Sequence, residues 1–293
     1  MKTTINWLSA GLLVMLSMNP AYAAAPAKPE AGLWYLGEGP GSLEDGTGTR
    51  FSATQWGFEI PLEKKLRKTE RFQSRIQMEW TEFDWQGANA AEGEYIWLSM
   101  PILYQQQRGR KHQFLLNFEP GLMTDGGNVG FDHIGLNGSA VGRKLWRNGG
   151  YWQYGVIVDR RFGDYDARPV LGMAWQASKR TWMELGFPET HVRHTLSSTV
   201  QSFFHIRPAG GVWRHAVVGQ NKDVNLHYTN WQVGAGLTFN WRESMWLNAE
   251  VGQLRKRQIR GFADGADADT APTGVKATPG QDRYWQLGAE IRF

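Results

Sequence analysis

The chain has 293 residues, no cysteine and a formal net charge of +4. The lack of cysteine excludes a small secreted scaffold stapled by disulfides. The charge excess is mild and the basic residues are scattered among acids, which argues against nucleic-acid binding. A mean hydropathy of -0.47 resembles that of a soluble protein, but lumen faces and loops also make a β-barrel polar on average.

The N-terminus has the pattern of a secretory signal peptide. Lys2 precedes an apolar run from Trp7 to Met18, and Pro20 and the small-residue site Ala21-Tyr22-Ala23 follow. This run is shorter than the ~20 residues that a membrane-spanning helix needs. We therefore expect residues 1–23 to be removed and residues 24–48, which are rich in glycine, to be irregular.

Residues 49–293 are expected to form one barrel, because apolar and polar residues alternate with a period of two between turn signals, without a convincing helical period. The first predicted strands are Arg50–Leu62, Glu70–Trp85, Tyr95–Tyr104, His112–Leu122, His133–Trp146 and Tyr151–Phe162. Pro101 interrupts the third of them and indicates a bulge or a strand end.

The second half continues the same rhythm. Its predicted strands are Pro169–Gln176, Thr181–Phe187, a long strand His191–Ile206, its neighbour Gly211–Val218, then Tyr228–Trp241 and Met245–Leu254. The segment Lys256–Asp282 is expected to be a solvated extracellular loop. Its acids, Asp264, Asp267 and Asp269, lack the spacing of a calcium-binding EF-hand loop.

The last segment, residues 284–293, is typical of the closing strand of a bacterial outer-membrane β-barrel. Trp285, Leu287, Ile291 and Phe293 share one face with Ala289 and form the expected membrane-insertion signal, while polar residues occupy the other face. The sequence thus predicts an all-β fold, a transmembrane antiparallel up-and-down barrel in the outer membrane. Its expected partners are membrane lipid and, through this strand, the barrel-assembly machinery.

The strand number follows from counting the segments. Thirteen are found, and single-chain bacterial barrels have even numbers. We predict about 12 strands, with 10 to 14 as the range and 14 as the next choice.

The chain contains 15 tryptophans, more than a soluble domain needs. We expect most of the aromatic residues near strand ends to form two interfacial girdles, where a ring is half apolar and half hydrogen-bonding. Core aromatics in a soluble sandwich are the alternative. The expected girdle residues are Trp34, Tyr35, Trp80, Trp85, Trp97, Trp146, Trp152, Trp175, Trp182, Trp213, Trp231, Trp241, Trp246 and Trp285.

Charged residues on the predicted inner faces are the functional candidates. They could line an eyelet that sets selectivity, or pair across strands and fill the lumen. No long segment in the middle of the chain looks like a constriction loop, which favours a filled or gated lumen over a freely open one. The candidates are Arg71, Arg75, Glu79, Glu119, Asp159, Arg161, Arg193, Glu250, Glu290 and Arg292.

Catalytic and metal sites find little support. The segment from His133 to Ser139 resembles the His-x-Ser-Asn-Gly segment of outer-membrane phospholipases, but Gly135 stands where that motif has its nucleophile. His191 and His205, if on one strand, lie roughly 46 Å apart. An approach of His205 to His215 on a facing strand stays open. We predict no catalytic residue, metal or cofactor.

The segments Pro169–Trp175, Trp182–Pro188 and Gly210–Trp213 form a Pro-led Gly/aromatic strand, a Trp-containing turn and a Leu-Gly-Phe-Pro end. With these, the central third resembles a family of uncharacterised outer-membrane β-barrel proteins of Gram-negative bacteria. The resemblance implies fold and location. Because the family's activity is undefined, it implies no catalytic residues.

Three function classes follow. The first is a porin-like pore for small solutes, and the second is a structural or surface-interaction barrel that acts through its loops. The third, a lipid-modifying enzyme, is disfavoured by Gly135.

Overall fold

The computed structural model describes residues 30–43, 49–67, 69–86, 93–126, 130–146, 149–216, 223–242, 244–263 and 275–292. The predicted signal peptide, the acids Asp264, Asp267 and Asp269, and Phe293 lie outside the described residues.

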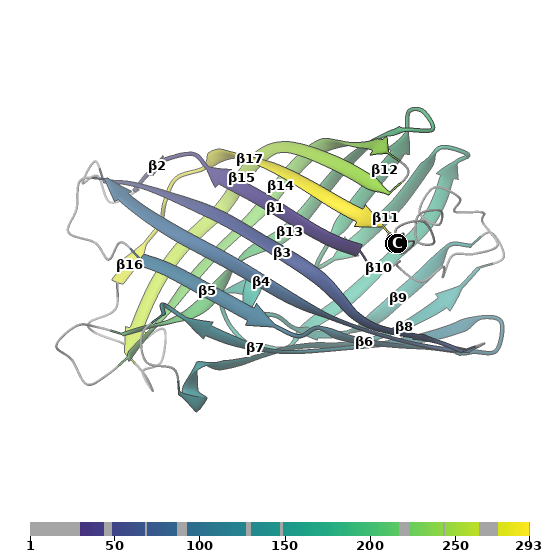
Figure 1. The fold of residues 1–293 in the computed structure, drawn as a ribbon, viewed down its shortest axis with the longest axis horizontal. Coiled ribbons are helices and arrows are strands. Elements are labelled where there is room, and N and C mark those ends of the chain that lie inside the picture. The colour runs from purple at the N-terminus through teal and green to yellow at the C-terminus, as the bar shows by residue number, and fades with distance from the viewer. Residues whose placement is uncertain are drawn as a thin grey trace, which may run out of the picture.

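The wall of the molecule is a closed antiparallel β-barrel (Figure 1). Closure comes from β1 and β17, which pair from Glu30↔Arg292 to Glu38↔Tyr284. In chain order the wall contains β1 (Glu30–Glu38), β3 (Arg50–Leu66), β4 (Glu70–Gln86), β5 (Gly93–Ser99), β6 (Ile102–Arg108), β7 (His112–Thr124), β8 (Ile134–Leu145), β9 (Tyr151–Val158), β10 (Arg168–Ser178), β11 (Thr181–Phe187), β12 (Thr190–Thr195), β13 (Val200–Ala216), β14 (Asp223–Arg242), β15 (Met245–Ala263) and β17 (Asp282–Arg292).

Fourteen strand positions make up this wall in the described part of the chain. The preferred number of about 12 is two too low, and the observed number is the second choice, at the upper end of the predicted range of 10 to 14. β5 and β6 are halves of one position, because both pair with β4 and β7 and separate only at Met100 and Pro101. Two short strands, β2 (Gly41–Ser42) and β16 (Val275–Ala277), lie outside the fourteen.

Strand β1 is the position that the sequence missed. The prediction that residues 24–48 are irregular is wrong for β1, which pairs with β3 on one side and β17 on the other. Its glycines make this segment look unlike a strand in the sequence. In the structure, Gly37 lies under the Trp285 ring, where an added Cβ would come within 2.9 Å of the indole. Glycine is therefore compatible with this strand because a neighbouring aromatic ring fills the space.

The predicted long strand His191–Ile206 is also wrong. β12 ends at Thr195, the chain turns, and β13 runs without interruption from Val200 to Ala216, so the predicted neighbouring strand from Gly211 is, as far as Ala216, the continuation of β13. Ser197 accepts hydrogen bonds from the backbone N–H groups of Thr199 and Val200 and stabilises this turn. The run Ser197-Ser198-Thr199 fits a polar strand face in the sequence, but Ser and Thr also favour turns, and here they form one.

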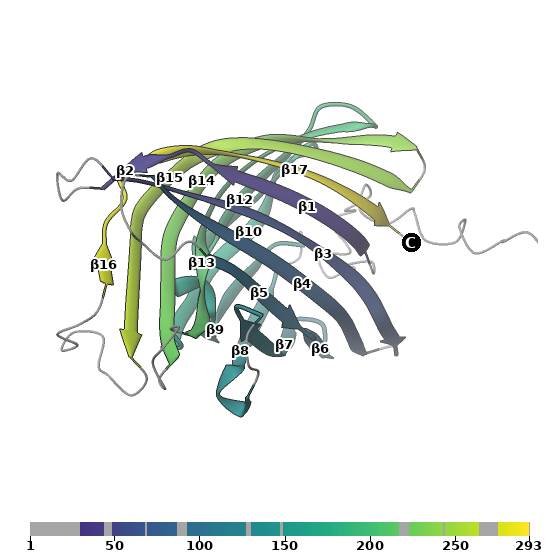
Figure 2. The ribbon, with the colours of Figure 1, turned by 60° about the vertical axis from the view of Figure 1, so that its left-hand side comes forward.

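The two ends of the barrel differ. At one end, called here the turn end, short connections such as residues 109–111 and 179–180 join the strands. The start of β1 at Glu30 and the end of β17 at Arg292 also lie at this end. At the other, the loop end, the connections include residues 130–133 and 159–167. Figure 2 shows the strands crossing between these ends at a steep tilt, with β2 and β16 near the loop end. Bacterial outer-membrane barrels place short turns in the periplasm.

The outer surface carries an apolar belt. Large side chains at alternate positions are exposed, among them Leu237 at 51%, Val251 at 66% and Leu287 at 52%. Exposure of so many apolar groups would be unfavourable in water, and it is what a lipid-facing wall requires. The protein is therefore an outer-membrane-type β-barrel whose strands cross the membrane. Among the described residues, no helix has the length and apolar character needed to cross a bilayer.

Part of the predicted aromatic girdle lies inside the barrel. Trp152, Trp241 and Trp285 are exposed on the belt, as a girdle requires. Four others are buried and correct the prediction, because their strand positions face the lumen: Trp85, Trp97, Trp213 and Trp246.

The loop end of the lumen is filled by an aromatic cluster. Side chains from opposite walls meet there, so that Phe83 packs 5.4 Å from Trp213 and 5.5 Å from Tyr228 between ring centroids. Such buried aromatic pairs stabilise by more than their area alone. The cluster consists of Phe51, Ala53, Phe83, Trp85, Tyr95, Trp213, Tyr228 and Ile259.

Candidate functional site in the lumen

The connection between β9 and β10 folds into the barrel. The sequence predicted strand to Phe162, but β9 ends at Val158 and a 3-10 helix spans Arg160–Phe162. Asp159 caps this turn by accepting a hydrogen bond from the Arg161 backbone N–H at 2.9 Å. The Asn137 side chain accepts another from the Arg160 N–H. We call residues 159–167 the inner loop.

Arg160 attaches the inner loop to the opposite wall. Its guanidinium lies 2.7 Å from the Glu79 carboxylate on β4, and the side chains are only 3% and 13% exposed. The same guanidinium stacks 4.6 Å from the Trp97 ring and 5.4 Å from the Trp213 ring. A planar cation between two aromatic faces with a carboxylate at its edge is a favourable arrangement for arginine.

The inner loop also occupies a gap in the strand ladder. β12 pairs with β13 only as far as Ile206, so the rest of β13 has no β12 partner. The 3-10 helix of the inner loop packs against β13 instead. Next to it, His227 on β14 hydrogen-bonds the Gly163 carbonyl. The wall at this point is therefore completed by a loop and not by a strand.

Charge pairs hold the inner loop at its start. Arg161 lies 2.7 Å from Asp159 and 3.1 Å from Glu189, the residue before β12. Burial raises the pKa of Asp159, but the Arg161 guanidinium and its hydrogen bonds outweigh burial and hold the pKa below its usual value. Burial raises the pKa of Tyr165 in the same loop to about 12. Asp159 is thus charged at neutral pH and Tyr165 is neutral.

Two polar cavities lie on opposite sides of the lumen. The first, which we call the loop chamber, has a volume of about 420 Å³. Glu119 in it accepts hydrogen bonds from Trp97 Nε1 at 3.1 Å and Ser99 Oγ at 2.8 Å. Its charged residues are Glu59, Arg75, Glu79, Glu119, Asp159, Arg160 and Arg161.

The second cavity, which we call the histidine chamber, has a volume of about 220 Å³ and is formed by β12, β13, β14, β15 and β17. Glu250 Oε1 lies 3.1 Å from His205 Nε2 and 4.0 Å from Arg207, and it also accepts from the Tyr284 hydroxyl. Its ionisable residues are His191, Arg193, His205, Arg207, Glu250, Glu290 and Arg292.

The histidine chamber corrects the expected separation of two histidines. His191 and His205 are register partners on β12 and β13 and both line this cavity, because the chain turns between them. His215 lies on the same strand as His205, so the idea that a facing strand brings them together is wrong. Among the described residues, no group of three or more His, Asp or Glu side chains could hold a metal ion.

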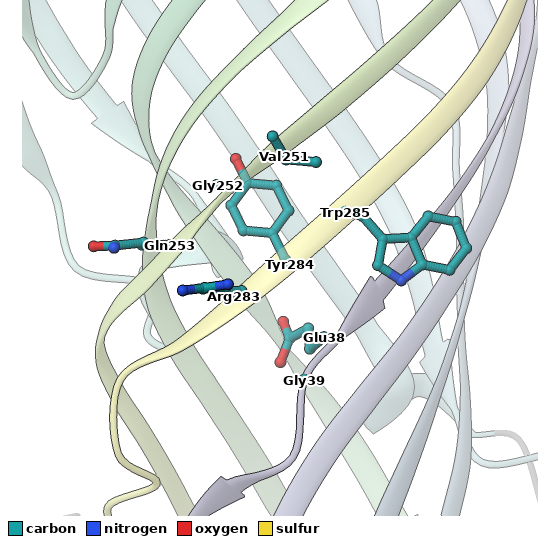
Figure 3. Close-up of a pocket in the computed structure, with 8 residues that line it drawn as sticks. All are labelled: Glu38, Gly39, Val251, Gly252, Gln253, Arg283, Tyr284 and Trp285. Atoms are coloured by element: carbon teal, nitrogen blue, oxygen red, sulfur yellow. The ribbon is translucent and has the colours of Figure 1, made fainter.

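A third pocket, of about 610 Å³, indents the wall where β15 and β17 separate after the pair Leu254↔Asp282. Figure 3 shows Tyr284 and Trp285 leaving β17 in different directions, with the Glu38 carboxylate beside the strand. Trp285 is 44% exposed on the belt, whereas Tyr284 is buried. The pocket therefore combines belt-facing and lumen-facing residues.

A buried ion pair closes the wall behind this third pocket. Lys256 adopts a φ of +51° in a β-bulge, and the bulge turns Arg257 toward the lumen. Arg257 lies 2.9 Å from Glu38, with side chains that are 0% and 1% exposed. Tyr228 also donates to Glu38, at 2.5 Å. The segment predicted as loop from Lys256 onward is thus strand as far as Ala263.

Nine of the ten predicted lumen residues line one of the two chambers, and Arg71 lines neither. Sequence reasoning missed Arg160, Arg207, His191 and His205 as lining residues. Asp159 before a predicted strand end, with Gly163 soon after, was the signal that could have identified the inner loop.

The segment that resembles phospholipases has a packing role here. His133 Nδ1 accepts a hydrogen bond from the Gly130 N–H. Gly135 faces the Trp97 ring, and an added Cβ would come within 2.9 Å of it. A glycine at this position lets β8 approach the ring, which a serine nucleophile would disturb.

No family model and no curated protein matches the chain. Among solved structures, it is similar to a deletion mutant of the monoaromatic hydrocarbon channel TodX, whose parent is from Pseudomonas putida, at 10% identity over 95% of this chain and 94% of that chain, with a TM-score of 0.45. It is also similar to the translocator domain of the autotransporter NalP from Neisseria meningitidis at 12% identity over 95% and 93%, with a TM-score of 0.33. Similarity to OccK7 of Pseudomonas aeruginosa reaches 8% identity over 91% and 98%, with a TM-score of 0.34.

All three are outer-membrane β-barrels.

Proposed function

We propose that the protein is a gated channel for small polar solutes in the bacterial outer membrane. The observation that carries this proposal is the pair of charged chambers on opposite sides of the lumen. A barrel that served only as a membrane anchor could fill this space with apolar side chains at lower cost, because buried charges must be compensated. Solvated charges facing a cavity are what a pore for polar solutes uses for selectivity.

The inner loop is the proposed gate. It stands where β13 has no strand partner on its β12 side, and side-chain contacts hold it there in place of a continuous hydrogen-bonded ladder. Loops attached in this way belong to the less stable parts of a fold. Displacement of the inner loop would open the loop chamber toward the outside, while the aromatic cluster beside it stays packed.

Orientation and processing belong to the same proposal. The turn end faces the periplasm, as short turns do in this class of barrel, and the loop end faces the exterior. We further expect the signal peptide to be cleaved near Ala23. The barrel-assembly machinery would recognise β17 through the exposed Trp285, Leu287 and Ile291.

A structural or surface-interaction barrel is the second candidate, and the aromatic cluster that fills the loop end favours it. Conductance of the refolded mature protein in a planar bilayer separates the two. A channel gives discrete openings in salt solution. A structural barrel gives flat traces. Heat-modifiable migration in gels verifies that the protein is folded in this case.

A further inference from the structure

The carboxylates of the histidine chamber are already engaged by the chamber's own donors. Glu290 accepts from Arg292 at 2.9 Å and 3.2 Å and from Asn248 at 3.3 Å. Glu250 is bound by Tyr284 and His205, with Arg207 nearby. Both carboxylates are therefore already paired with cationic or hydrogen-bonding groups of the chamber, which weakens their attraction for a positively charged ligand.

Positive charges exceed negative charges in this chamber. Three guanidinium groups, those of Arg193, Arg207 and Arg292, stand against two carboxylates. In addition, His191 Nε2 is buried and has no hydrogen-bond partner within the described parts of the chain. A buried polar atom without a partner is costly, and this cost is removed when a ligand or water binds it.

We propose that the histidine chamber binds a small oxyanion, a carboxylate or a phosphate, with Arg193 and His191 among its contacts. The inference rests on the proposed channel and names its solute class. Arginine pairs with both oxyanions through two parallel hydrogen bonds, so the shared chemistry and not one molecule is identified. The chamber's 220 Å³ equals about seven water volumes, which limits the anion to a few heavy atoms.

The loop chamber does not offer the same site. It contains four carboxylates, those of Glu59, Glu79, Glu119 and Asp159, against three arginines. Its excess charge is negative, and Arg160 is committed to Glu79. Anions are therefore expected on the β12–β17 side of the lumen, with repulsion from the opposite side directing them there.

Titration calorimetry of the folded, detergent-solubilised protein tests binding directly, with sodium phosphate and sodium acetate as the two probes. We expect both anions to bind, and Arg193→Gln to weaken binding by at least about tenfold. Arg193→Lys keeps the charge but loses the two-pronged geometry, so its affinity for both anions should lie between those of the wild type and Arg193→Gln. Arg71→Gln removes a charge from the β4 end outside both chambers and should leave binding unchanged.

The reversal potential in a salt gradient gives the second readout. Anion selectivity that Arg193→Gln lowers and Arg71→Gln does not supports the inference. Conductance without anion selectivity and without phosphate or acetate binding overturns the inference and leaves the channel in place. Anion binding in a barrel that never conducts overturns the channel and retains the site. Binding that is equal in wild type and Arg193→Gln assigns the anion to another place and overturns the proposal.

Discussion

The guanidinium of Arg160 lies 2.7 Å from the carboxylate of Glu79, although 81 residues separate them in the chain. This pair joins the inner loop to β4 across the lumen. Because both side chains are largely buried, water screens their attraction less than it would at the surface. The contact is therefore a stronger attachment of the proposed gate than an exposed ion pair of the same geometry would be.

Replacement of Glu79 by Gln should open the gate more often. The amide keeps the size of the side chain but removes its charge, and charge-assisted hydrogen bonds are worth about 1.5–3 kcal/mol. We expect the swelling rate of liposomes in small sugars to rise by about tenfold. As a matched control, Glu63→Gln removes the partner of Lys65 in an exposed pair and should leave the rate unchanged.

Acid should also release the inner loop. The folded-state pKa of Asp159 is held below its usual value of 3.8, so its contribution is present above that value and is lost as the pH falls through the folded pKa. Permeability should therefore rise only below about pH 4. Asp159→Asn should raise permeability at neutral pH and weaken the acid response. A rise centred above about pH 5 would assign the response to a different group.

Loss of the buried ion pair behind the third pocket should destabilise the barrel. Glu38→Ala leaves Arg257 as an uncompensated buried charge next to Tyr228, and such changes cost about 3–5 kcal/mol. Urea-induced unfolding in lipid vesicles measures the difference. Glu63→Ala serves as the exposed comparison, with a change expected below about 1 kcal/mol. Equal effects of the two substitutions would contradict the structural role of the Glu38–Arg257 pair.

Neighbouring residues on β14 should respond in opposite ways to a new charge. Leu237 is 51% exposed on the apolar belt, and Leu237→Arg should cost about 2–4 kcal/mol of folding free energy in a bilayer. Thr238 lines the histidine chamber, and Thr238→Arg should fold normally. Folding yields into vesicles test both. A tolerated Leu237→Arg would show that this face does not contact lipid.

Alternation alone predicted much of the wall. β4, β7, β8 and β11 lie close to the segments expected for them, because one face of each meets lipid and the other the lumen. The same alternation placed Arg75, Glu79 and Glu119 on the inner side, where they line the loop chamber.

Three local events escaped this reasoning. A β-bulge at Lys256 switches which residues face inward, so Arg257 joins the buried core although simple alternation gives it the other face. The Ser-rich turn between β12 and β13 converts one apparent strand into two and brings His191 opposite His205. Arg160 was overlooked because an inward loop follows no strand period.

Single-channel recording of the wild-type mature chain and of Glu79→Gln, side by side in a planar bilayer, tests the gated channel most directly. We predict brief, infrequent openings for the wild type. For Glu79→Gln we predict openings of the same conductance that last longer, because the Arg160 attachment is weakened. Flat traces from both proteins, with each shown to be folded by heat-modifiable migration, would contradict the proposed channel.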